Sequence, residues 1–133
     1  MEVKTHRRAN PRLVGRPLKL GDGEATVELE ALEEMAVDEW GLIHGGFTFG
    51  LADYAAMLAV NHPNVVLASA EVRFTAPVRV GDLIRVEARV VEERGEWRRV
   101  EVEVSVDDRT VLEGVMDCVV LRRHVLDRGE KSS

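Results

Sequence analysis

The chain has 133 residues, of which 45% are hydrophobic and 32% charged, a balance typical of a globular chain rather than a disordered one. The formal net charge of −6 argues against broad nucleic-acid binding, which needs a basic face. The length fits one domain spanning residues 1–133, and no apolar run is long enough to cross a membrane. Because the first residues are basic and polar and Cys118 is the single cysteine, we expect no disulfide and a cytoplasmic location.

The N-terminal part of the chain shows little regular pattern before its first turn. Residues 1–17 are predicted to form an arm or a short helix, and the turn at Gly21 to Gly23 follows them. Alternating apolar and acidic side chains over residues 25–37 then predict strand structure. We therefore expect one or two strands in this part of the chain.

The segment GLIHGGFTFGLADYAAMLAVN, residues 41–61, is apolar on nearly every side and predicts a buried helix, which Pro63 stops. Alternating runs after it predict four strands, over residues 65–76, 82–93, 97–106 and 110–122. The polar tail at residues 125–133 is expected to fray. One dry face on each strand and one apolar helix together predict an α+β fold, with a curved antiparallel sheet wrapped around a central helix.

Asp53 is a lone carboxylate at the centre of this apolar helix. Burying an ionised group costs several kcal/mol unless it is compensated, so either the helix exposes one face or the carboxylate has a function. Gly45 and Gly46 stand at the helix start, where unpaired N–H groups can bind an oxyanion, although a simple turn explains the glycines equally well. His44 adds a polar ring beside them, and a lone histidine of this kind is more often a structural hydrogen-bonding group than a catalyst.

The spacing of these residues constrains any shared site. Asp53 follows Gly45 by eight residues, which is roughly 12 Å along a helix. A donor and a carboxylate that act on one carbonyl group cannot be more than about 7 Å apart. Two such helices packed antiparallel about a twofold axis could bring the Gly45 of one subunit to the Asp53 of the other.

Three features together resemble the hotdog-fold acyl-CoA thioesterases of the phenylacetate-degradation (PaaI-like) type. They are His44-Gly45-Gly46, an aspartate nine residues after the histidine, and the turn from Pro77 to Asp82. The resemblance covers about residues 25–121. It implies a hotdog fold and hydrolysis of an acyl-CoA to a free acid and coenzyme A. The Gly45 N–H would polarise the thioester carbonyl, and Asp53 would act as nucleophile or general base beside His44.

The resemblance also implies the surroundings of the site. Asp38 stands where the family usually has an asparagine that places the acyl group or water, and Ser69 lies near a hydroxyl position that orients water in some relatives. Gly46 and Phe47 are also expected to contact the substrate. Arg73 is one of several arginines that are candidates for binding the coenzyme A phosphates. No metal or other cofactor is expected, coenzyme A being part of the substrate. A homodimer with composite sites is expected, with further pairing into a homotetramer.

Two alternatives remain open at this point. A non-catalytic acyl-CoA or acyl-carrier binding module on the same fold is one, and Asp38 is the residue that favours it. A hotdog dehydratase or hydratase is the other; it would need a catalytic histidine paired with a helix carboxylate and usually a Pro-Gly-rich helix entry. The chain has neither such an entry nor the expected spacing, which disfavours this alternative. Its four histidines are scattered without ligand spacing, which is why no metal is expected.

Overall fold

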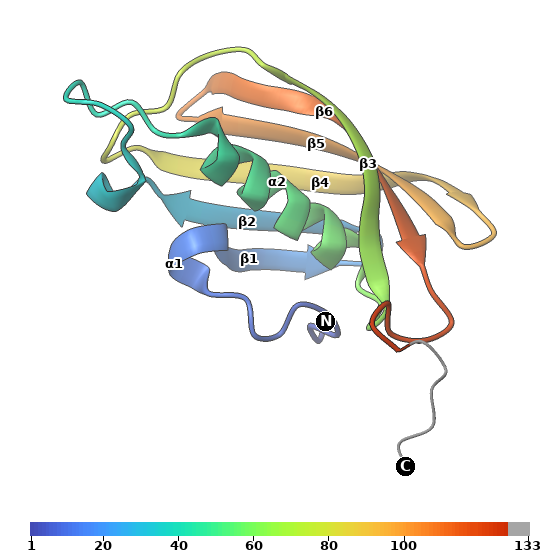
Figure 1. Ribbon diagram of the computed structural model, residues 1–133. Coiled ribbons are helices and arrows are strands. Elements are labelled where there is room, and N and C mark those ends of the chain that lie inside the picture. Colours follow the sequence, from blue (N-terminus) through green and yellow to red (C-terminus); the bar gives the residue numbers. More distant parts are fainter. Residues whose placement is uncertain (128–133) are drawn as a thin grey trace.

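Six strands form one antiparallel sheet that curves around a single long helix (Figure 1). The computed structural model describes residues 1–127. The chain order is α1 (Pro11–Val14), β1 (Arg16–Gly21), β2 (Glu24–Glu30), a 3-10 turn η1 (Glu33–Met35), α2 (Gly45–Val60), β3 (Val65–Phe74), β4 (Leu83–Arg94), β5 (Trp97–Val106) and β6 (Arg109–Val120). The strands are ordered β1-β2-β4-β5-β6-β3 across the sheet. This hotdog arrangement confirms the predicted fold class.

The core lies between α2 and the inner face of the sheet. Alternate residues of the central strands are buried there, among them Val27, Leu29, Ile84, Val86, Val100, Val102 and Val104. The residues between them, such as Glu87 and Glu101, face outward and are exposed. Helix α2 is buried on most sides, and it packs mainly on β2, β4 and β5. The alternation that predicted strands therefore separates a dry face from a charged one.

The N-terminal boundaries differ from the prediction. The strand predicted over residues 25–37 is shorter in the structure: β2 ends at Glu30, opposite the first residue of β4, Leu83, and the 3-10 turn η1 follows it. The predicted arm contains α1, but β1 already begins at Arg16. In the predicted tail, Val125 and Leu126 are exposed, and residues 128–133 lie outside the described residues. Within residues 1–127, no helix is long and apolar enough to cross a membrane.

Strand β3 lies at one edge of the sheet and pairs with β6 alone. The two strands approach closely at Gly114, which is opposite Val72. A Cβ on Gly114 would overlap the carbonyl oxygen of Glu71 and would lie 2.7 Å from the Cα of Val72. Both are backbone atoms that cannot rotate away, so the glycine is required for β3 to pair at this position.

Replacing Gly114 with alanine is therefore expected to destabilise the fold by about 1–3 kcal/mol, since overpacking forces the backbone to move. Gly50→Ala is the matched control, because a Cβ there meets nothing within 4 Å. Alanine in the helix interior should stabilise by about 0.5–1 kcal/mol. Urea unfolding at equal protein concentration measures both changes; equal stability of the two variants would contradict the close approach at Gly114.

Candidate functional site

His44 is the N-cap of α2 and fixes the start of the helix. Its Nδ1 accepts a hydrogen bond from the Gly46 N–H at 2.7 Å, and its ring lies edge-on to Phe47 with centroids 6.3 Å apart. Accepting at Nδ1 places the proton of the neutral ring on Nε2, which leaves one donor on an exposed side chain. The Gly46 N–H, which we expected to contact substrate, is thus already occupied within the chain.

The Gly45 N–H is the donor that the first turn of α2 leaves available. No acceptor pairs with it among residues 1–127. The ring of Phe74 lies over Gly45, so close that a Cβ on this glycine would stand 3.2 Å from Phe74 Cε1. A cavity of about 380 Å³ opens beside it, lined by Leu42, Ile43, Gly45, Thr48, Phe74, Thr75, Ala76, Pro77, Val78 and Val111. An unpaired amide facing a mostly apolar cavity is suited to binding a carbonyl oxygen.

Asp38 stabilises the loop that leads to this helix. Its Oδ1 accepts hydrogen bonds from the N–H groups of Trp40 at 2.9 Å and Leu42 at 3.1 Å. Its carbonyl oxygen accepts from the N–H of Gly41, which has a positive φ of 79°. These contacts give Asp38 a structural role in shaping one wall of the cavity; its predicted contact with substrate stays a prediction.

Asp53 lies half-buried on α2, about two turns beyond Gly45. Burial raises the pKa of the Asp53 carboxyl, and the nearby His6 opposes this rise. The carboxylate accepts no hydrogen bond from residues 1–127. It is therefore a partly desolvated base without hydrogen-bond partners in one copy of the chain, the environment that often marks a reacting carboxylate.

Cys118 lies close enough to Asp53 for the two groups to interact electrostatically. The thiol is fully buried, and burial, together with the charges of Asp53 and Asp117, raises its pKa to about 12. A neutral thiol of this kind is a poor nucleophile. Its role is packing on the inner face of the sheet.

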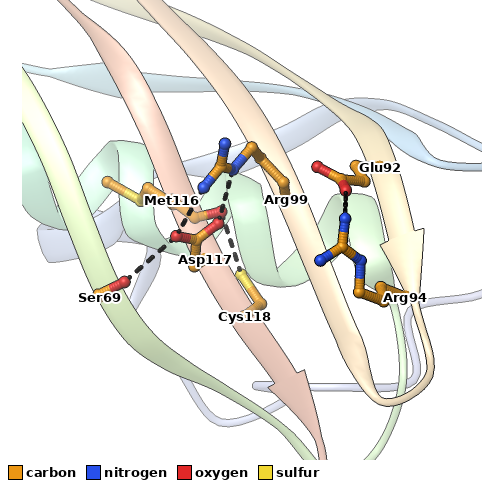
Figure 2. Close-up of polar contacts among 7 residues, drawn as sticks. All are labelled: Ser69, Glu92, Arg94, Arg99, Met116, Asp117 and Cys118. Atoms are coloured by element: carbon orange, nitrogen blue, oxygen red, sulfur yellow. Dashed lines mark hydrogen bonds and ion pairs between the residues drawn. The ribbon is translucent and has the colours of Figure 1, made fainter.

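Ser69 and Arg73 lie on the outer face of the sheet, away from α2. Strict alternation from Leu67 would place Ser69 on the inner face, but a bulge shifts the register between these two residues and turns Ser69 outward. Its hydroxyl donates to Asp117 at 3.3 Å, and Asp117 also accepts from Arg99 at 3.0 Å (Figure 2). Arg73 is exposed opposite Glu113. Within one chain, neither residue is brought together with Gly45 or Asp53.

Several residues at the site were not found by sequence reasoning. Phe74 and Thr48 line the cavity, and the guanidinium of Arg109 donates to the carbonyl of Pro77, one of the lining residues, at 3.1 Å. His6 of the N-terminal arm is near enough to Asp53 for its charge to lower the pKa of that carboxyl. Thr48 lies on α2 itself, one turn after Gly45. Phe74, Arg109 and His6 come from segments distant along the chain, so the sequence carries no local signal for them. Among residues 1–127, no cluster of three or more His, Cys, Asp or Glu side chains is placed to hold a metal ion.

Comparison with known proteins gives the family. A family model described as the thioesterase superfamily matches residues 41–113. An uncharacterized protein of Pyrococcus horikoshii, PH1136, is 56% identical with a TM-score of 0.95, over 96% of this chain and 98% of that one. A mutant form of the phenylacetic acid degradation protein PaaI from Thermus thermophilus, with asparagine changed to aspartate, is 29% identical with a TM-score of 0.76, over 82% and 95% of the two chains.

Two sequence relatives are longer proteins. The chain is 49% identical over 131 residues to a methylthioribose-1-phosphate isomerase of Aquifex aeolicus, which covers 98% of this chain but only 28% of that protein. It is 25% identical over 117 residues to transcription factor FapR of Caldanaerobacter subterraneus, which covers 87% of this chain and 58% of that protein. Their names therefore describe more than the region matched here. The family match over more than half of the chain, together with the hotdog architecture, shows that this protein belongs to the thioesterase superfamily.

Proposed function

We propose that this protein is an acyl-CoA thioesterase that hydrolyses an acyl-CoA thioester to a free acid and coenzyme A. The observation that carries the proposal is the pair of groups on α2. An unpaired Gly45 N–H opens onto a cavity, and a half-buried Asp53 carboxylate with a raised pKa follows on the same helix. Membership of the thioesterase superfamily supports a thioester as the bond that they act on.

Each group has a distinct part in the proposed reaction. The Gly45 N–H donates to the carbonyl oxygen of the thioester and stabilises the negative charge that develops there. Asp53 either attacks the carbonyl carbon or accepts a proton from the water that attacks it. The C–S bond then breaks, and coenzyme A leaves as a thiolate that takes up a proton. If Asp53 is the nucleophile, the acyl group remains on it as an anhydride, and water then hydrolyses the anhydride to release the free acid. If Asp53 is the base, the attack of water gives the free acid directly, and the proton that Asp53 accepted passes to the thiolate. A carboxylate whose pKa is raised by burial is a stronger base for this step than an exposed one.

The proposed site is composite, formed by two copies of the chain. Gly45 and Asp53 are eight residues apart on one helix, or roughly 12 Å, which is too far for both to act on one carbonyl group. The free edge of β3 supports a dimer. Its middle residues, Ala68, Ser69 and Ala70, are exposed, uncharged and free of proline, so this part of the edge is open to pairing. A second β3 paired there about a twofold axis would continue the sheet and place α2 of each copy near the other.

The cavity supports a small or mainly apolar acyl group. Its volume of about 380 Å³ lies near the lower end of the range for small-molecule sites, and apolar side chains form most of its wall. Phe74, whose ring lies over Gly45, is 57% exposed and could close over a bound acyl chain. Arg109, which donates to the carbonyl of Pro77 in the cavity wall, is placed to meet a phosphate of coenzyme A.

A non-catalytic acyl-CoA binding module is the second candidate. The likeness to transcription factor FapR favours it, because that protein is named as a regulator and not as an enzyme. Asp38 does not by itself favour the binding module. Its two hydrogen bonds in the loop need only a side-chain oxygen acceptor, which aspartate and asparagine both provide. Turnover separates the two candidates.

Release of free thiol from a panel of small aromatic and medium-chain acyl-CoAs tests the enzyme. Asp53→Asn is expected to lower kcat by about 10²–10⁴-fold, the usual contribution of a positioned base.

Gly45→Pro should lower kcat by about 10²–10³-fold, because it removes the donor. Proline suits the first position of a helix, and His44 before it already has an extended ψ of 129°. Asp22→Asn, in the exposed turn between β1 and β2, is the control for which kcat should not change. Tight binding of acyl-CoA by the unaltered protein without any thiol release would favour the binding module instead.

Mixing two inactive variants tests the composite site. A subunit with Asp53→Asn keeps its Gly45 donor, and a subunit with Gly45→Pro keeps its carboxylate, so a mixed dimer holds one intact site. Random pairing of equal amounts, by co-expression with two different tags, should restore about a quarter of the unaltered activity. If the Gly45 and Asp53 of one chain served the same site, the mixture would stay as inactive as its components.

A further inference from the structure

The N-terminal arm, residues 2–6, is attached to the C-terminal end of α2 (Figure 1). Asn61 makes the attachment: its side chain accepts from the Lys4 N–H and donates to the Glu2 carbonyl, both at 2.8 Å. Asn61 has a left-handed backbone with φ 51°, and its own N–H caps the helix by donating to Met57 at 2.7 Å. Thr5 of the arm is buried. The arm is therefore part of the folded structure and lies against the half of α2 that carries Asp53.

Two contacts hold the His6 ring against the part of α2 that carries Asp53. Its Nδ1 hydrogen bonds with the Thr5 hydroxyl at 2.8 Å. Its ring packs on Tyr54, the residue after Asp53, with centroids 6.4 Å apart and planes tilted by 50°. The charge of His6 acts on Asp53 and lowers the pKa that burial raises. The imidazole thus has a defined place next to the carboxylate.

The other titratable groups near Asp53 carry no compensating charge. Cys118 faces it from β6 and is a neutral thiol, since burial raises its pKa to about 12. Tyr54 is its neighbour on α2, and burial raises the pKa of its hydroxyl as well, so the phenol is also neutral. Among residues 1–127, His6 is therefore the cationic group that offsets the desolvation of Asp53.

We propose that the N-terminal arm is part of the catalytic site and that His6 is a positioning residue for the Asp53 carboxylate. The inference rests on the proposed thioesterase function. Histidines ordinarily titrate near pH 6.5, so an imidazolium charge is present in the acidic range where carboxylates titrate. His6 then extends the pH range in which Asp53 is ionised toward acid, and the arm makes activity at acidic pH depend on the first residues of the chain.

The sign of the effect gives the test. Without the His6 charge, the pKa of Asp53 rises further, and the fall of kcat on the acidic side moves to higher pH. His6→Gln should shift this limb to higher pH while kcat near pH 8 stays close to that of the unaltered protein. His6→Lys restores a positive charge and should bring the limb back. His124→Gln, which removes an exposed histidine outside the sheet, should leave the limb unchanged.

A second variant tests the arm without altering His6. Asn61→Gly keeps the left-handed helix cap, which glycine adopts readily, but removes both hydrogen bonds to the arm. It should shift the limb in the same direction as His6→Gln. A uniform loss of kcat at every pH in these variants, or an unchanged limb in His6→Gln, would overturn the proposal.

A readout independent of turnover separates this inference from the proposed function. The side-chain carboxyl carbon of Asp53 is titrated by NMR in the unaltered protein, His6→Gln and His6→Lys. A higher Asp53 midpoint in His6→Gln, with recovery in His6→Lys, supports the coupling between the two side chains. If no acyl-CoA is hydrolysed in that case, only the thioesterase proposal is overturned. Thiol release with an Asp53 midpoint that is the same in all three proteins would overturn the role of His6 and leave the thioesterase standing.

Discussion

The rigid length of α2 between Gly45 and Asp53 is the constraint on which the rest of the structure depends. The helix is buried on most sides and has no proline or bulge between the two residues, so their separation is set by the helical rise. A donor and a base fixed at such a distance cannot serve one small reacting group. The unpaired edge of β3 and the exposed Phe74 are both available for the contacts that the proposed dimer requires.

The backbone N–H groups around the start of α2 differ in whether they have an acceptor. His44 accepts a hydrogen bond from the Gly46 N–H, and Asp38 accepts from those of Trp40 and Leu42. The Gly45 N–H remains without an acceptor next to the cavity. Histidine and aspartate here act first as acceptors that hold the loop and the helix start. Preorganisation of this kind lets one amide stabilise a developing charge without first giving up another hydrogen bond.

The Asp53 carboxylate, unlike the polar groups at the helix start, has no hydrogen-bond partner within the described part of one copy of the chain. An apolar helix on the inner face of a sheet disfavours an ionised carboxylate, and burial raises the pKa of Asp53 accordingly. A fully hydrogen-bonded carboxylate would be stable but would be a weaker base. Compensation by a partly exposed histidine from the arm is milder, because its charge acts through space and leaves the carboxylate oxygens free.

The sequence by itself determined the central elements and the spacing of the two key residues. Strands β4 and β5 alternate clearly because each has one dry face, and α2 is apolar throughout with Asn61 and Pro63 at its end. The order of the strands was decided only by the tertiary structure, as were the limits of β1 and β2, because pairing depends on which strand lies alongside. The bulge before Ser69 places its side chain on the outer face of the sheet, and no pattern in the neighbouring sequence predicts this bulge. His6 and Asp53 likewise meet only through folding, because periodicity reports which face a residue occupies and not which distant segment covers that face.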